Sequence, residues 1–170
     1  MRELFLKLGI IAKGNIQFKV TLEELKDLLY KNMDNSVQVS RMNATGNDYR
    51  GVIINNTFKL EENYRTFDSN YNPARIKGTI NTTQEGVSVD FEVTGVVSAT
   101  VLFMIVGFGF ILTGIITAPI FRTFEALTLI PAGIFALIFM VYMARDFVSK
   151  MLTKFEHDIF YYVNREVRAR

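Results

Sequence analysis

The stretch that decides the fold runs from Val96 to Ala144 and has the sequence VVSATVLFMIVGFGFILTGIITAPIFRTFEALTLIPAGIFALIFMVYMA. It contains two uncharged runs, 96–118 and 126–144, on either side of a short segment that holds Arg122 and Glu125. A helix needs roughly 20 apolar residues to cross a bilayer core of about 30 Å, and both runs reach about that length. The sequence therefore predicts a transmembrane helical hairpin with spans at about 96–118 and 126–144.

The segments on either side indicate that the hairpin is inserted into one soluble domain. Just before it, apolar residues alternate with polar ones, as in a strand with one buried face: Val87, Val89, Phe91 and Val93. Just after it, residues 145–170 contain no Gly or Pro and carry an apolar face at helical spacing: Val148, Met151, Leu152, Phe155, Ile159, Tyr162 and Val163. We expect this terminal helix to pack back on the sheet. The sequence leaves open whether it continues directly from the second span.

The N-terminal segment predicts a strand and one capped helix. Residues 1–12 fit either a helix or a strand. Gly14-Asn15 is typical of a turn, and residues 16–20 alternate as a strand does. Thr21 and Glu24 match a capping box, in which each side chain bonds the backbone amide of the other residue. The helix that follows is expected to end near Met33, at Asp34-Asn35.

Beyond this helix the apolar period changes from about 3.6 to 2, which predicts about five antiparallel strands. One short strand is expected around Val37 and Val39, and residues 49–54 and 57–62 form a hairpin that turns at Asn55-Asn56. Two more strands flank a turn at residues 84–86. The predicted fold class is α+β. It consists of a small antiparallel sheet of helix-grip or pleckstrin-like type (residues 1–94), the hairpin (95–144) inserted before a long C-terminal helix, and that helix (145–170).

Two blocks of the sheet region carry a recognisable pattern. They are GVIINNTFKL at residues 51–60 and, after Tyr64, NPARIKGTI at residues 72–80. With the hairpin and the terminal helix, they resemble a group of small, uncharacterised bacterial membrane proteins that share Gly-x-Ile, Asn-x-Phe-x-Ile and Pro-x-Ile-x-Gly-x-Ile strands. Leu60 stands where the group tends to have isoleucine, and residues 70–73 are a shorter match than the group's. The resemblance covers the chain from about Gly51 onward and implies topology only, because its motif residues are structural glycines, asparagines and a proline.

The composition argues against several classes of function. The net charge of +2 does not suggest a basic surface that would bind nucleic acid. The chain has no cysteine, so we expect no disulfide framework and no cysteine metal site. It has no Gly-x-Ser-x-Gly, phosphate-loop or His-Glu-x-x-His motif, so we predict a protein that is not an enzyme and has no cofactor or metal site. His157 is interpreted as part of a solvated helix face. Asp90 and Glu92 are interpreted as a solvent-facing pair on one strand.

The distribution of basic residues predicts the orientation of the hairpin. Arg145, Lys150 and Lys154 follow the second span, whereas the connecting loop offers only Arg122. We therefore expect a multi-pass protein of the inner (cytoplasmic) membrane with both termini in the cytoplasm. Arg145, Lys150 and Lys154 could also contact anionic headgroups, with membrane lipid as a partner.

Small residues in the two spans predict close helix packing. They are Gly107, Gly109, Thr113 and Gly114 in the first span, and Ala132 and Ala136 in the second. Small residues let helix backbones approach where lipid offers no hydrophobic drive. The contact predicted is either within the hairpin or between protomers, the second giving a homo-oligomer or a complex with other membrane subunits.

Aromatic side chains predict what the terminal helix meets on the sheet. Five of them could line a ligand cavity there: Tyr49, Tyr64, Phe91, Phe155 and Tyr162. An ordinary aromatic core is the simpler interpretation, because the chain has 15 Phe and 7 Tyr. The leading hypothesis is a membrane-anchored cytoplasmic module that senses or binds a lipid, a small ligand or a protein partner. The alternative is an oligomerising membrane effector or structural subunit of a membrane complex.

Overall fold

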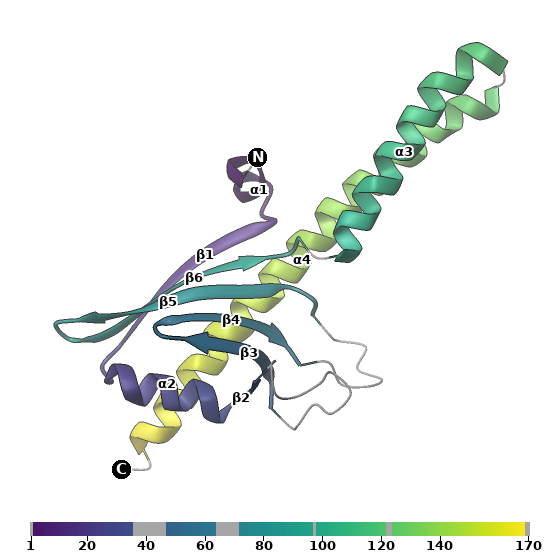
Figure 1. Cartoon of the computed structure of the whole chain (residues 1–170). Coiled ribbons are helices and arrows are strands. Elements are labelled where there is room, and N and C mark those ends of the chain that lie inside the picture. The colour runs from purple at the N-terminus through teal and green to yellow at the C-terminus, as the bar shows by residue number, and fades with distance from the viewer. Residues whose placement is uncertain (1, 36–46, 64–71, 97, 122–123, 169–170) are drawn as a thin grey trace.

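The computed structural model describes residues 2–35, 47–63, 72–96, 98–121 and 124–168 (Figure 1). The fold is α+β, as predicted, with a six-stranded sheet and a long C-terminal helix. Its elements are α1 (Arg2–Lys7), β1 (Ile11–Phe18), α2 (Leu22–Lys31), β2 (Met33–Asn35), β3 (Tyr49–Ile54), β4 (Thr57–Glu62), β5 (Arg75–Thr83), β6 (Gly86–Thr94), α3 (Ser98–Phe121) and α4 (Phe124–Arg168).

The sheet has the strand order β1-β6-β5-β4-β3-β2 and is antiparallel except for the β2–β3 pair. Because side chains alternate along each strand, one face is apolar, with Ile16, Val89 and Ile80 in register across β1, β6 and β5. This face shares one hydrophobic core with α2 and the second half of α4. The opposite face is polar and carries Lys13, Glu92 and Lys77 side by side in register.

Helix α4 is one continuous helix of 45 residues. Its first half packs along α3 to form the hairpin, and its second half crosses the apolar face of the sheet (Figure 1). The terminal helix is therefore the direct continuation of the second apolar segment. One continuous helix joins the hairpin to the core of the soluble domain.

The hairpin is long and apolar enough to cross a membrane. In α3 the window Thr100–Thr117 has a mean hydropathy of 2.3 and is only 17% buried. The core helix of a soluble protein would bury most of such a surface. Large apolar side chains are exposed on both helices, with Phe135 at 70% and Ile105 at 63%. Both soluble segments attach to the same end of the hairpin (Figure 1).

Three local predictions are confirmed. Thr21 caps α2, and the reciprocal bonds of the capping box with Glu24 are both present. The β3–β4 hairpin turns at Asn55-Asn56, where Asn55 has a φ of 56°, a left-handed conformation that asparagine tolerates. The β5–β6 hairpin turns at residues 84–85. These turns fix the register of the central strands.

Two local predictions are wrong. Gly14-Asn15 is not a turn but lies within β1. A glycine stands in this strand because the ring of Phe91 occupies the space that a side chain at position 14 would need. A Cβ at Gly14 would lie 2.3 Å from that ring. The segment Met33–Asn35 does not end a helix but forms β2, since α2 already ends at Lys31. The expected strand at Val37 and Val39 lies outside the described residues, and the ambiguous N-terminal segment is α1 followed by the start of β1.

Candidate functional site

Phe155 is the centre of the contact between α4 and the sheet. It is 1% exposed, and its ring centroid lies 5.0 Å from that of Phe91, 5.9 Å from that of Phe58 and 6.0 Å from that of Tyr49. Edge-on and tilted aromatic pairs at these distances add to the free energy gained by burial alone. Of the aromatic residues singled out from the sequence, Tyr49 and Phe91 therefore meet Phe155 directly, together with Phe58, which the sequence did not single out.

The space between these aromatic rings is almost completely filled. The cavity lined by Tyr49, Phe155 and Tyr162 measures about 10 Å³, roughly the volume of one water probe. Phe91 is also buried in this core. Tyr64 lies outside the described residues. The four described members of the predicted ligand set are thus brought together as packing partners, and a ligand here would have to displace them.

A row of polar side chains fastens α4 to the rest of the soluble domain. The row is Lys154, Asp158, Tyr162 and Glu166, and its partners are Glu62, Tyr49, Asp48 and Lys31. Tyr49 donates its hydroxyl hydrogen to Asp158 at 2.8 Å. Tyr162 donates to Asp48, also at 2.8 Å. Because residues four apart share one helix face, these contacts run along a single edge of α4.

Both tyrosine hydroxyls in this row stay protonated. Burial raises the pKa of Tyr49 far above its usual value, and the charge and hydrogen bond of Asp158 raise it further. Burial and then Asp48 raise the pKa of Tyr162 in the same way. Neutral tyrosines can donate to carboxylates over the whole physiological pH range. The two bonds are therefore structural contacts and are not poised for proton transfer.

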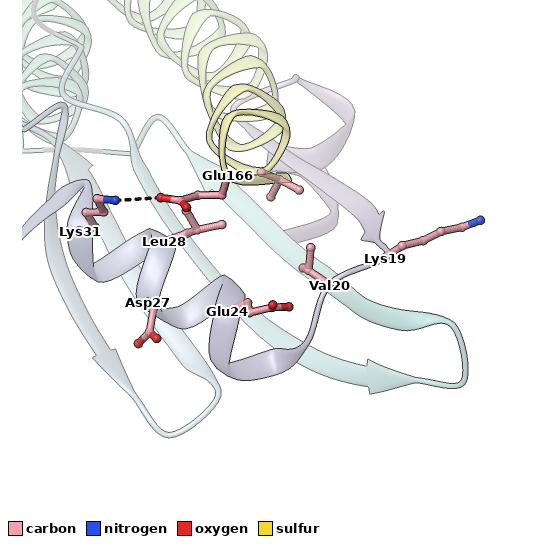
Figure 2. A pocket seen from close by; sticks show the side chains of 8 residues that line it. Lys19, Val20, Glu24, Asp27, Leu28, Lys31 and Glu166 are labelled. Carbon is pink, nitrogen blue, oxygen red and sulfur yellow. Dashed lines mark hydrogen bonds and ion pairs between the residues drawn. The ribbon is translucent and has the colours of Figure 1, made fainter. Parts of the chain in front are cut away.

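An open groove lies between α2 and the C-terminal end of α4 (Figure 2). Its volume is about 470 Å³, within the range of small-ligand pockets. The apolar lining consists of Val20, Leu28 and Val163. The charged lining consists of Lys19, Glu24, Asp27, Lys31 and Glu166. The ion pair between Lys31 and Glu166, at 2.8 Å, links the two helices within the groove (Figure 2).

The three basic residues predicted to contact lipid headgroups lie in different surroundings. Arg145 is exposed where α4 leaves the hairpin, with its side chain against Gly9. Lys150 is exposed and pairs with Asp146 at 2.7 Å. Lys154 is half-buried, bonds Glu62 and lies 5.8 Å from the centre of the Tyr49 ring. Arg145 is thus nearest to the apolar hairpin, whereas Lys154 contributes to fastening α4.

The hairpin packs through glycines that face each other across the two helices. A Cβ at Gly133 would lie 2.6 Å from the backbone oxygen of Gly107, and a Cβ at Gly107 would lie 2.9 Å from Leu137. Gly114 is also buried. Gly133 was not among the residues singled out from the sequence, although a glycine in an apolar span is itself a signal of close helix approach.

The other small residues of the spans lie at the edge or outside of this contact. Gly109 has no atom within 4 Å of the position that a Cβ would take, and Thr113, one turn further on, is exposed. Ala132 is exposed and Ala136 is half-buried. Gly109 and Thr113 therefore form an open small-residue surface on α3, turned away from α4.

The carboxylate pair on β6 is not uniformly solvent-facing, which corrects the interpretation from sequence. Asp90 is exposed, but Glu92 is 8% exposed and bonds both Arg2 of α1 and Lys77, the latter at 3.0 Å. Burial alone would raise the pKa of Glu92, but the hydrogen bonds and charges of Arg2 and Lys77 outweigh it and hold the pKa below its usual value. Glu92 therefore ties α1 to the polar face of the sheet.

His157 lies on the exposed face of α4, with its side chain 77% exposed and its Nδ1 3.3 Å from Asp158. In the described part of the chain, no three His, Cys, Asp or Glu residues are grouped to hold a metal ion. The chain matches no protein-family model, no curated protein and no solved structure. The resemblance to two-span bacterial proteins stays a prediction.

Proposed function

We propose that the protein is a membrane-anchored binding module that reports occupancy of its soluble domain to its spans. The observation that carries the proposal is that α4 is continuous from the hairpin to the groove. A binding event that moves the C-terminal end of α4 must also act on its first half, which lies in the hairpin, because an α-helix is stiff over this length. The polar row and Phe155 connect α4 to the rest of the soluble domain, so a movement of the helix also acts on the sheet.

The proposed binding site is the groove between α2 and α4. The four side chains of the polar row already have partners, and the core around Phe155 is filled. The groove, in contrast, is open and combines an apolar floor with charges of both signs. Such a surface suits a small amphipathic molecule or a short peptide that can pair with Lys31 and Glu166. Its occupant would compete with the ion pair that holds the end of α4 to α2.

The proposed location is the inner membrane, with both termini and the whole soluble domain in the cytoplasm. The support is the apolar hairpin and the basic residues, led by Arg145, that follow the second span. With this orientation the groove faces the cytoplasm at the end of α4 that is farthest from the bilayer.

The binding proposal is tested by native mass spectrometry of protein released from membranes in mild detergent. The wild-type protein is expected to carry a bound molecule, and Val20→Trp, which fills the groove from its partly buried wall, is expected to lose most of it. Phe160→Trp is the matched control, because Phe160 is 46% exposed on α4 and does not line the groove. Thermal melting of each variant confirms that it is folded.

Two results would contradict the binding proposal. The first is a wild-type protein that is recovered without any bound molecule from repeated preparations. The second is a bound molecule that Val20→Trp retains as fully as Phe160→Trp does. Hydrogen exchange supplies a second readout of binding, because occupancy of the groove should change amide exchange in the last turns of α4, which line it.

The second candidate function is an oligomerising membrane effector or structural subunit. It is favoured by the open small-residue surface at Gly109 and Thr113, which the hairpin itself leaves uncovered. The same surface on a second copy would allow close approach of two α3 helices. Cross-linked oligomers that disappear in Gly109→Leu would support this candidate, and oligomers and function that both survive the substitution would remove it.

A further inference from the structure

The N-terminal helix α1 presents apolar side chains to the outside at the base of the hairpin. Leu4 is 55% exposed and Leu8 is 36% exposed, and residues four apart lie on one helix face. Leu8 is held in helical geometry by its amide, which donates to the carbonyl of Leu4 at 2.9 Å. Leu4 on α1 and Leu8, in the turn just after it, thus form a small exposed apolar surface.

The chain fixes the position of α1 against the spans. Ile10, just after the helix, is 1% exposed and forms a small core with Met140 and Ala144 of α4. Phe5 of α1 packs against the same core, together with Met104 of α3. This core lies at the end of the hairpin nearest the sheet, and Figure 1 shows α1 to one side of that end, above the start of β1.

Two further contacts hold α1 at this level. Gly9, with a φ of +70°, ends the helix, and its amide donates to the carbonyl of Leu6 at 3.1 Å. Gly9 lies against the side chain of Arg145, the first charged residue after the second apolar run. At the other end of the helix, Arg2 bonds Glu92. These contacts therefore hold α1 at the level where the apolar part of the hairpin ends and charged residues begin.

We propose that α1 lies in the membrane surface, with Leu4 and Leu8 inserted among the lipid acyl chains. Leu4 is next to Phe5 and Leu8 is two residues before Ile10, and both Phe5 and Ile10 pack on the spans, so the two leucines lie close to the base of the hairpin. Lys7 and Arg145 are exposed beside it and suit the phosphate groups at that depth. The proposal rests on the proposed function, because it requires the hairpin to cross a bilayer.

The chain contains no tryptophan, so a single introduced tryptophan reports its own surroundings. Leu4→Trp and Leu8→Trp are compared with two well-exposed control positions. Ile115→Trp, at a site 56% exposed on α3, reports the bilayer core, and Ile54→Trp, at a site 60% exposed at the β3–β4 turn, reports water. Each variant is reconstituted into phosphatidylcholine–phosphatidylglycerol vesicles, with and without brominated acyl chains.

The expected result is that brominated chains reduce the emission of Leu4→Trp and Leu8→Trp at least about twofold, as side chains buried at the headgroup boundary should show. Ile115→Trp should be quenched as well, and Ile54→Trp should be quenched only by iodide in the water. If Ile115→Trp is quenched while the α1 variants behave like Ile54→Trp, the proposal that α1 lies in the membrane surface is overturned. The proposal that the hairpin crosses the membrane is then retained. If Ile115→Trp is not quenched either, the membrane anchor itself is overturned.

Discussion

Replacing Phe155 with alanine should lower the unfolding free energy of the soluble domain by about 3–5 kcal/mol, the usual cost of removing a fully buried phenyl ring. The ring touches Tyr49, Phe58 and Phe91, which come from three different strands, so its loss leaves a cavity that no single neighbour can fill. Urea unfolding in detergent, followed by the near-ultraviolet signal of the aromatic core, measures the change.

Phe160→Ala is the matched control for this variant. Phe160 is on the same helix but 46% exposed, and its ring lies 5.2 Å from that of Phe18. It should cost about 1 kcal/mol or less, because a half-exposed ring loses less burial and leaves no closed cavity. Equal losses in the two variants would contradict the view that α4 is held on the sheet through Phe155.

Replacing Gly133 with leucine should separate the two helices of the hairpin. Even the first carbon of a side chain would lie 2.6 Å from both the backbone oxygen of Gly107 and a side-chain carbon of Ile111. Backbone atoms cannot move aside, so α3 and α4 must part. A cysteine pair at Phe103 and Phe139, whose rings lie 5.9 Å apart across the two helices, should then lose most of its reaction with a short bifunctional linker.

Gly109→Leu is the control for hairpin separation. It adds the same side chain to the same hairpin, but the space beyond Gly109 is open, so the cross-link within the hairpin should form as in the wild type. Loss of that cross-link in Gly109→Leu, or its retention in Gly133→Leu, would show that the helices meet through other faces. Cross-links between chains in Gly109→Leu report separately on the oligomer hypothesis.

Much of the fold could be predicted from the sequence because its signals are local. The capping box at Thr21, the Asn55-Asn56 turn and the alternation along β6 each depend on residues a few positions apart. The apolar face of the terminal helix is predictable as well, since Phe155 and Tyr162 fall on it at helical spacing. The long uncharged runs predicted the hairpin for the same reason.

The features that could not be predicted depend on partners far away in the sequence. Gly14 is typical of a turn until the ring of Phe91 is seen to occupy its side-chain space. Glu92 appears solvated until Arg2 is brought over it by the fold. Within the spans the side chains are apolar on every side, so periodicity does not reveal which face of α3 meets α4. The open Gly109 face was therefore singled out, and Gly133 was not.

The groove escaped sequence reasoning for a related reason. Its lining comes from the β1–α2 connection, from α2 and from the last turns of α4, which only the complete fold brings together. Lys31 and Glu166 are ordinary surface charges in the sequence and become an ion pair across the groove. The α1 surface was missed because a six-residue helix gives too short a pattern to separate helix from strand.

One unbroken helix joins the apolar hairpin to the sheet. The chain has no cysteine, so Phe135→Cys and His157→Cys, both at well-exposed sites on α4, accept spin labels without further changes. A continuous α-helix rises about 1.5 Å per residue, so pulsed electron spin resonance in lipid nanodiscs should give one narrow distance distribution near 33 Å. A broad distribution, or a peak well below that distance, would mean that α4 bends or breaks near Arg145 and would contradict the coupling of groove and spans.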